Sequence, residues 1–363
     1  MIDTLDLQFN LTSRGNDYLY ISLFMQNSGI LFPKSREMLK KGKYYFVGRI
    51  PPFNLFYNRN YSYITIGFCP KIMLKRYPCK DDLEFIETTL KDVLFDKLRV
   101  PRHYVKSITL NRIDYKIDTK ISEVVEPIIY NLMSKAPDNL NNVVKTTFET
   151  AISYTPENGY VEVITYNKEK QLLNIKYKDY ITEDDLQEFK WVFRTEVRIK
   201  NRKFNYYKYS ENWSLAKELK NYLCEDMKEY FWKRFVEKVW FAEPFYRVDV
   251  AVKIIANNSS LTTYTKKVLI GVIKRINKRG YTSTSKHYAY TKRISKIERY
   301  IRSGASEIEI EVLKNKALCS EDFSTFRGYI KQIRNLGINP LTFDKHFNIE
   351  KIENFAKYNS NVA

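Results

Sequence analysis

The sequence predicts an α+β fold in which a largely antiparallel sheet with flanking helices precedes a smaller, basic helical domain. Short runs rich in β-branched and aromatic residues, separated by Asn, Pro and Gly, fill the first 200 residues. Beyond residue 256, apolar residues recur at helical spacing. The segment 261–303 holds twelve Lys and Arg against one acid, in a 363-residue chain of net charge +19. We therefore expect a sheet domain over residues 1–255 and a basic helical domain over residues 256–363.

Eight strands are expected in the first domain. They cover residues 3–9, 18–24, 44–48, 61–68, 107–118, 149–154, 160–167 and 191–200. Asn158-Gly159 favours a hairpin between the sixth and seventh strands, because these residues tolerate the positive φ of a tight turn. The expected helices cover residues 81–93, 122–134, 211–240 and, near the end of the chain, 320–337. The segment NNSSLTT at residues 257–263 has the composition of a linker.

Composition narrows the class of protein. Hydrophobic residues make up 44% of the chain and aromatic residues 15%, which is enough for a core and excludes intrinsic disorder. No apolar run approaches the ~18–20 residues that span a bilayer, and the first residues lack a signal-peptide pattern. The four cysteines form no paired motif, so we expect reduced thiols in a cytoplasm and no membrane partner. The positive charge favours a polyanion as partner.

Charged residues recur on one face of three expected strands, because side chains alternate between the two faces of a strand. The three sets are Arg112, Asp114, Lys116 and Asp118; Arg194, Glu196, Arg198 and Lys200; and Tyr160, Glu162, Tyr166 and Lys168. If the strands are neighbours in one sheet, one face forms the core and the other carries carboxylates, cations and tyrosines. Such a face is either a functional site or a surface in water.

This combination of residue types suits one kind of chemistry. Carboxylates from different strands, in a chain with three scattered histidines, favour an oxygen-preferring ion such as Mg²⁺ or Mn²⁺. A tyrosine hydroxyl can attack a phosphodiester and retain the phosphate covalently. Its ordinary pKa is about 10, so a nearby cation such as Lys168 would favour the reactive phenolate. The metal ion would stabilise the charge that develops on the phosphate.

Two basic clusters suggest that the polyanion is nucleic acid. In RTEVRIKNRKFNYYKY, cations alternate with aromatic residues, an arrangement in which cations hold phosphates and rings stack on unpaired bases. The second cluster is the helical segment 261–303. A solvated helical face is the alternative for either cluster taken alone.

Six segments occur in a recognisable order along the chain. They read MIDTLDLQFN, NYSYITIGFCPKIML, NRIDYKID, ETAISYTPENGYVEVITYNKEKQL, FRTEVRIKNRKF and FSTFRGYIKQIRNLGI. In sequence and order they resemble the replication initiators encoded by gene II of filamentous phages and related plasmid proteins. The R-I-D motif of that family falls on residues Arg112 to Asp114, its Tyr-x-Lys motif on Tyr166 and Lys168, and its strand glutamate on Glu196.

The resemblance implies a function. The family cuts one strand of duplex DNA at an origin, starts rolling-circle synthesis, holds the 5′ phosphate on a tyrosine, and later rejoins the displaced strand, with Mg²⁺. It implies that Tyr166 is the nucleophile, that Asp114 and Glu196 are metal ligands, and that Lys168 aids ionisation or binds phosphate. Asp118 is a third expected ligand of the Mg²⁺ or Mn²⁺ ion. It is not part of the family motif, and only its place on the same strand face as Asp114 supports this role.

The implied partners are origin DNA, both duplex and single-stranded, and a host helicase and polymerase in the cytoplasm of a bacterial host cell. The expected DNA contacts are Arg112, Arg194, Arg198, Lys200, Arg202 and Lys203 near the sheet, and Lys274, Arg275, Lys278, Arg279, Lys292 and Arg293 in the helical region. In that region, the cations would set the position of the duplex through phosphate contacts.

Several alternatives stay open. Tyr160, Tyr206 and Tyr207 are other candidate nucleophiles, and Arg112 has a second interpretation as a structural partner of Glu196. A DNA-binding regulator on the same fold, without catalytic activity, is the first alternative function. A related mobilisation relaxase, which shares the chemistry but serves DNA transfer, is the second.

Overall fold

The computed structural model describes most of the chain. The described residues are 2–11, 45–50, 53–58, 63–74, 82–98, 100, 105–138, 143–156, 160–174, 183–200, 222–223, 225–304, 306–312 and 323–358. The expected strand at residues 18–24 lies outside them.

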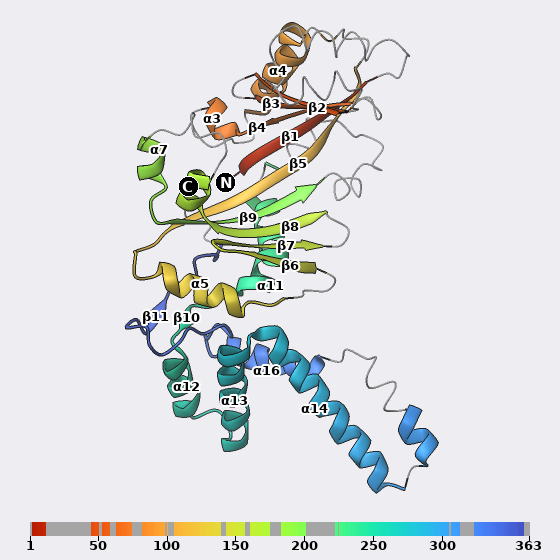
Figure 1. Ribbon diagram of the computed structural model, residues 1–363, viewed down its shortest axis with the longest axis vertical. Coiled ribbons are helices and arrows are strands. Elements are labelled where there is room, and N and C mark those ends of the chain that lie inside the picture. The colour runs from red at the N-terminus through yellow and green to blue at the C-terminus, as the bar shows by residue number, and fades with distance from the viewer. Residues whose placement is uncertain are drawn as a thin grey trace.

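One antiparallel sheet forms the centre of the molecule (Figure 1). Its strands are β1 (Ile2–Leu11), β2 (Tyr45–Ile50), β3 (Phe53–Asn58), β4 (Tyr63–Phe68), β5 (Val105–Lys120), β6 (Val143–Phe148), β7 (Ala151–Pro156), β8 (Val161–Asn167) and β9 (Val192–Lys200). They lie in the order β2-β3-β4-β1-β5-β9-β8-β7-β6, and every pairing is antiparallel. The predicted α+β class with a largely antiparallel sheet is therefore confirmed.

One face of the sheet is apolar because alternate residues of its strands are large and hydrophobic. Ile113 and Tyr115 of β5 and Val197 of β9 are buried there. The helical segment α10 (Glu225–Phe231), η6 (Trp232–Val236) and α11 (Glu237–Trp240) covers this face. Trp240 Nε1 donates a hydrogen bond to Thr165 Oγ1 at 2.9 Å, so the indole is buried with its polar atom satisfied.

The C-terminal residues return to the same face of the sheet. β11 (Lys351–Ile352) pairs with β10 (Phe245–Tyr246), and the Phe355 ring lies 4.8 Å from that of Trp240. Trp232 Nε1 donates to the Ala356 carbonyl at 2.7 Å. Residues 351–356 therefore complete the hydrophobic core between the sheet and η6.

Shorter helices flank the sheet. They are α3 (Pro70–Leu74), α4 (Leu83–Asp92) with its continuation η2 (Val93–Lys97), α5 (Glu126–Lys135), α6 (Lys168–Asn174) and α7 (Glu183–Glu188). The predicted helices at residues 81–93 and 122–134 correspond to α4 and α5, which begin two and four residues later than expected.

A group of helices lies beyond α5, away from the sheet (Figure 1). It comprises α12 (Val248–Asn257), α13 (Thr263–Arg279), α14 (Tyr281–Arg302) and α16 (Ser324–Asn335). A single residue, Gly280, joins α13 to α14, and its φ of 79° is one that glycine adopts without strain. Figure 1 shows α14 projecting away from the rest of the protein.

The expected linker at residues 257–263 is a short turn between two packed helices. α12 precedes it and packs against α13, and Thr262 caps α13 by accepting a hydrogen bond from the Thr265 amide at 3.2 Å. The expected boundary after residue 255 falls inside α12. The division into two domains stays a prediction. Among the helices that the structure describes, none is long and apolar enough to cross a membrane.

Candidate active site

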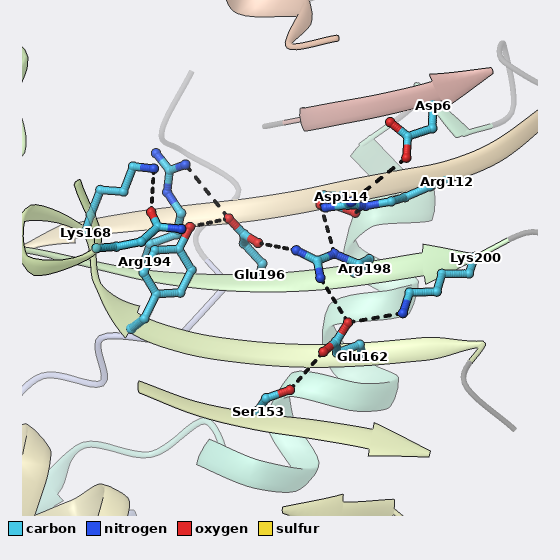
Figure 2. A network of polar contacts seen from close by, with 12 residues as sticks. Asp6, Arg112, Asp114, Ser153, Glu162, Lys168, Arg194, Glu196, Arg198 and Lys200 are labelled. Carbon is cyan, nitrogen blue, oxygen red and sulfur yellow. Dashed lines mark hydrogen bonds and ion pairs between the residues drawn. The ribbon is translucent and has the colours of Figure 1, made fainter. Parts of the chain in front are cut away.

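Three neighbouring strands bring most of the predicted site residues together on the polar face of the sheet (Figure 2). In the register of β5 and β9, Asp114 lies opposite Arg198, and Lys116 lies opposite Glu196. In the register of β8 and β9, Tyr166 lies opposite Arg194. Residues directly opposite one another in an antiparallel pair project to the same face, so the three predicted sets form one surface.

Tyr166 and Glu196 form the contact with the clearest chemical meaning. The Tyr166 hydroxyl donates a hydrogen bond to Glu196 Oε1 at 2.6 Å, and both side chains are buried. Arg194 Nη1 lies 3.8 Å from the same carboxylate oxygen. A carboxylate that already accepts the phenolic hydrogen has the geometry of a general base for that hydroxyl.

Lys168 approaches the phenol differently from the sequence prediction. β8 ends at Asn167, and Lys168 is the first residue of α6, because the Asn167 side chain accepts a hydrogen bond from the Lys170 amide at 3.0 Å. Lys168 Nζ donates to Gln171 Oε1 at 2.8 Å and lies 5.9 Å from the centre of the Tyr166 ring. The positive charge of Lys168 therefore lies over the Tyr166 ring and not beside its hydroxyl.

Asp114 is enclosed by two guanidinium groups. Arg112 donates to both of its oxygens, with Nε at 2.8 Å from Oδ1 and Nη2 on Oδ2. Arg198 Nε donates to Oδ2 at 3.2 Å. Burial alone would lower the pKa of Arg112, but the hydrogen bond and charge of Asp114 outweigh it and raise that pKa above its ordinary value. Arg112 therefore takes Asp114 as its structural partner.

Asp118 is held in a similar way at the other end of the face. Arg194 donates to it twice, through Nε at 2.6 Å and Nη2 at 2.9 Å, and Lys116 Nζ lies 3.2 Å away. Burial opposes ionisation of Asp118, yet the Arg194 hydrogen bonds and charge lower its pKa below the ordinary value.

The predicted metal ligands are all engaged by other side chains in this arrangement. The oxygens of Asp114 and Asp118 are taken by arginines, and Glu196 accepts from Tyr166. Within the described part of the chain, no three His, Cys, Asp or Glu side chains converge on a point that could hold a metal ion.

Two acidic residues of this face were not predicted as site residues. Asp6 of β1 lies opposite Arg112, with Oδ2 3.9 Å from its Nη1, and burial raises the Asp6 pKa to about 6 despite that positive charge. Glu162 of β8 lies opposite Arg198. Alternation within TLDLQF would have placed Asp6 on a polar face, but nothing in the sequence indicates that β1 lies next to β5.

The predicted DNA contacts near the sheet differ in their accessibility. Arg194 is 3% exposed, whereas Arg112 and Arg198 are 27% and 21% exposed. Lys200 is partly exposed and lies 3.4 Å from Glu162. The predicted contacts Arg202 and Lys203, and the alternative nucleophiles Tyr206 and Tyr207, lie outside the described residues.

The helical cations form a separate cluster. Lys274, Lys278 and Arg279 of α13 are exposed, and Arg275 is half-buried. On α14, Lys292 is exposed and Arg293 half-buried, and Lys292 Nζ donates to Ser324 Oγ at 3.0 Å. Figure 1 shows that α13 and α14 lie beyond α5 and so apart from the face formed by β5, β8 and β9.

No protein-family model matches the chain, and no curated protein matches it. Among solved structures, the chain is similar to a rolling circle replication initiator protein from Geobacillus stearothermophilus. The two share 10% sequence identity with a TM-score of 0.32, over 67% of this chain and 86% of the other.

Proposed function

We propose that this protein is a phage or plasmid rolling-circle DNA replication initiator that cuts and rejoins one strand at the origin. The observation that supports it most directly is the hydrogen bond from the Tyr166 hydroxyl to Glu196, 2.6 Å long, on a sheet face that also carries arginines. The order of the sequence motifs supports it independently, because the R-I-D motif, the tyrosine of the Tyr-x-Lys motif and the glutamate of the resembled family fall on three adjacent strands.

The proposed reaction is a transesterification. The Tyr166 oxygen forms a bond to the phosphorus of the scissile phosphodiester, and the bond from phosphorus to the 3′ oxygen breaks. Glu196 accepts the phenolic proton and returns it to the departing 3′ oxygen. The product is a 5′-phosphotyrosine and a free 3′ hydroxyl, and the reverse step rejoins a strand.

Arg112 and Arg198 are the arginines best placed to bind the scissile phosphate, because they are the partly exposed ones. Both now bind Asp114, so a phosphate would compete with that carboxylate for their hydrogen bonds. Mg²⁺ or Mn²⁺ remains part of the proposal on the family resemblance and is tested as a variable.

The proposed role of α13 and α14 is to hold the origin duplex while the sheet face acts on one strand. Lys274, Lys278 and Arg279 project from α13 as exposed cations, which suits sequence-independent contacts to phosphates. The separation of α13 and α14 from β8, the strand that carries Tyr166, fits a division between binding the duplex and cutting one strand (Figure 1).

A cleavage assay tests the proposal. Labelled single-stranded oligonucleotides from the intergenic region of the genetic element are incubated with wild-type protein, Tyr166→Phe and Tyr160→Phe, each with Mg²⁺, Mn²⁺ or a chelator. We expect a protein-linked DNA band in wild type and Tyr160→Phe, and none in Tyr166→Phe. Cleavage by wild type and by both variants would show that the nucleophile is another tyrosine or water.

Binding without cleavage by any variant would overturn the proposal and favour the DNA-binding regulator. If cleavage occurs, the neighbouring genes separate the two remaining functions. Capsid and coat genes indicate a phage initiator, whereas a secretion apparatus indicates a mobilisation relaxase.

A further inference from the structure

Helix α16 has one buried face and one exposed face. Phe326, Ile330 and Ile333 are buried, and the centre of the Phe326 ring lies 5.1 Å from that of Tyr281 and 6.0 Å from that of Tyr288, both on α14. The opposite side of the helix is exposed along its whole length, because exposed residues recur at a spacing of three or four. These residues form the α16 face: Ser324, Arg327, Gly328, Lys331, Gln332 and Asn335.

The α16 face is positively charged and carries no acid. The helix contains Arg327, Lys331 and Arg334, and it contains no Asp or Glu. Arg334 binds Glu243 at 2.9 Å, whereas in the described part of the chain the side chains of Arg327 and Lys331 form no hydrogen bond or ion pair. A helix face that is only solvated usually mixes both signs of charge. An unopposed positive face instead favours an anionic ligand.

The polar side chains of this face are of the types that distinguish base pairs. In the major groove of DNA, arginine and lysine donate to guanine, and glutamine and asparagine form bidentate pairs with adenine. Arg327, Lys331 and Asn335 follow one another at intervals of four residues, so they lie in one row along the helix. An α-helix is about 10–12 Å across and fits a major groove about 12 Å wide. The twelve residues of α16 span ~18 Å, the length of about five base pairs.

Gly328 lies in the middle of the α16 face, between Arg327 and Lys331. Glycine destabilises a helix interior relative to alanine, because it loses more conformational freedom on folding. The fold does not require a glycine there, since a Cβ atom at residue 328 would meet nothing within 4 Å. The missing side chain instead allows a ligand to approach the helix backbone closely. A helix that enters a groove of DNA makes such an approach.

The α16 face adjoins the basic surface of α14. Helix α16 packs against both α13 and α14 (Figure 1). Lys292 of α14 is exposed, and its Nζ donates to the Oγ of Ser324, the first residue of α16, at 3.0 Å. Cations suited to phosphates and side chains suited to base edges therefore lie on adjoining surfaces, and a protein that reads a duplex needs both.

We propose that α16 reads the origin sequence by entering the major groove of duplex DNA, where its exposed side chains contact base edges. The side chains that make these contacts are Arg327, Lys331, Gln332 and Asn335. This inference rests on the proposed function, and it adds sequence recognition to the phosphate contacts of α13 and α14. The ligand is double-stranded DNA, because the major groove of an RNA duplex is too deep and narrow for side chains to read.

Fluorescence anisotropy at one fixed salt concentration measures the Kd of two DNA duplexes. One is a fragment of the intergenic region of the genetic element, and the other has the same bases in scrambled order. We expect wild type to bind the intergenic duplex about a hundredfold or more tightly than the scrambled one. Gln332→Ala combined with Asn335→Ala should reduce this ratio by about tenfold or more. Because neither substitution changes the net charge, the Kd of the scrambled duplex should stay within about twofold of wild type.

Gly328→Gln tests the close approach of the helix backbone to DNA. Glutamine is a better helix former than glycine, so the melting temperature should equal or exceed that of wild type. The ratio of the two Kd values should nevertheless fall by about tenfold, because the new side chain holds the helix away from the bases. A purely structural role for Gly328 predicts the reverse, namely lower stability with an unchanged ratio.

Matched controls make the same changes on other helices. Gln187→Ala combined with Asn257→Ala removes one exposed glutamine from α7 and one exposed asparagine from α12. Ala256→Gln adds a glutamine at an exposed position of α12. Both controls should leave the ratio of the two Kd values unchanged. Circular dichroism and thermal unfolding establish that each variant is folded.

The outcomes separate this inference from the function on which it rests. An unchanged ratio in the α16 variants, or an equal loss of affinity for both duplexes, overturns the role of α16 alone. A wild type that forms the protein-linked band but binds both duplexes equally also overturns it and leaves the cleavage reaction standing. Selective binding that depends on α16, in a wild type that never forms the band, supports α16 and overturns cleavage. A folded wild type that neither binds nor cleaves DNA overturns both.

Discussion

Asp6 and Gly67 face one another across β1 and β4, and the Asp6 carboxylate occupies the space above the glycine. A Cβ atom at Gly67 would lie 2.5 Å from Asp6 Oδ1 and 3.4 Å from its Cγ. Asp6 therefore reaches the polar face beside Arg112 only because residue 67 has no side chain. Gly67 therefore shapes the polar face by leaving room for the Asp6 carboxylate, although it has no functional group of its own.

The close approach predicts that Gly67→Ala destabilises the protein. The new methyl group must displace the Asp6 carboxylate from a partly buried position, which we expect to lower the free energy of unfolding in urea by about 1–3 kcal/mol. Gly328→Ala is the matched control, because a Cβ there meets nothing within 4 Å and the residue lies inside α16. The control should be neutral or stabilising by up to ~1 kcal/mol. Equal losses in both variants would contradict the role of Asp6.

The pKa of Asp6 predicts a pH-dependent stability. Burial raises it from 3.8 to about 6, so the folded state binds the Asp6 proton more tightly than the unfolded state does. Ionising Asp6 therefore lowers the free energy of unfolding as pH rises from about 4 to about 6, and the loss is complete above that range. Asp6→Asn cannot ionise, and it should be more stable than wild type at pH 7 by up to ~3 kcal/mol.

Urea unfolding of wild type and Asp6→Asn at pH 4 to 8, in the presence of a chelator, measures this difference. Asp249→Asn is a control of opposite sign, since a hydrogen bond from Arg247 lowers the Asp249 pKa and stabilises the folded state at neutral pH. A constant difference between wild type and Asp6→Asn over the whole range would show that Asp6 titrates normally.

Part of the site was predictable because a strand repeats every two residues. That alternation placed Asp114 and Asp118 on one face of β5, and Glu196 and Arg198 on one face of β9, and the structure confirms both assignments. The alternation gave the wrong position for Lys168. Asn167 ends β8 and caps α6, so the two-residue repeat of the strand does not extend to Lys168.

Other features depend on pairings between distant segments, which a sequence pattern leaves open. Asp6 belongs to the polar network because β1 lies between β4 and β5 in the sheet. In the sequence, β1 and β5 are about a hundred residues apart. β6 was not predicted because its sequence, VVKTTF, does not alternate between apolar and polar residues; the strand lies at one edge of the sheet. The sequence also did not predict which carboxylate each arginine binds. Several carboxylates lie within reach of Arg112, Arg194 and Arg198.

The exposed cations of α13 predict the salt dependence of DNA binding. Replacing Lys274, Lys278 and Arg279 together with Gln should weaken duplex binding and reduce the slope of log K against log salt by up to about 3, if each contacts one phosphate. The matched control replaces Lys233, Arg234 and Lys238, which are also two lysines and one arginine exposed on a helical segment. Fluorescence anisotropy at several salt concentrations measures both. Equal changes in slope would mean that net charge, and not the α13 surface, determines binding.

Asp118 provides a test that separates a metal ligand from a structural partner. Its two hydrogen bonds come from Arg194, which is almost fully buried and would lose its bidentate partner in Asp118→Asn. We expect a loss of about 1–3 kcal/mol in the free energy of unfolding at pH 7. Because the folded pKa of Asp118 is lowered, this difference from wild type is present above pH 4 and disappears as pH falls through that pKa.

The metal dependence of cleavage distinguishes the two roles of Asp118. A residue that only holds Arg194 should leave the concentration of Mg²⁺ or Mn²⁺ required for half-maximal cleavage unchanged in Asp118→Asn. A ligand should raise that concentration by tenfold or more, roughly the effect of losing one carboxylate oxygen from a hard cation. Since both oxygens of Asp118 already bind the Arg194 guanidinium, we expect the first result: lower stability with unchanged metal dependence.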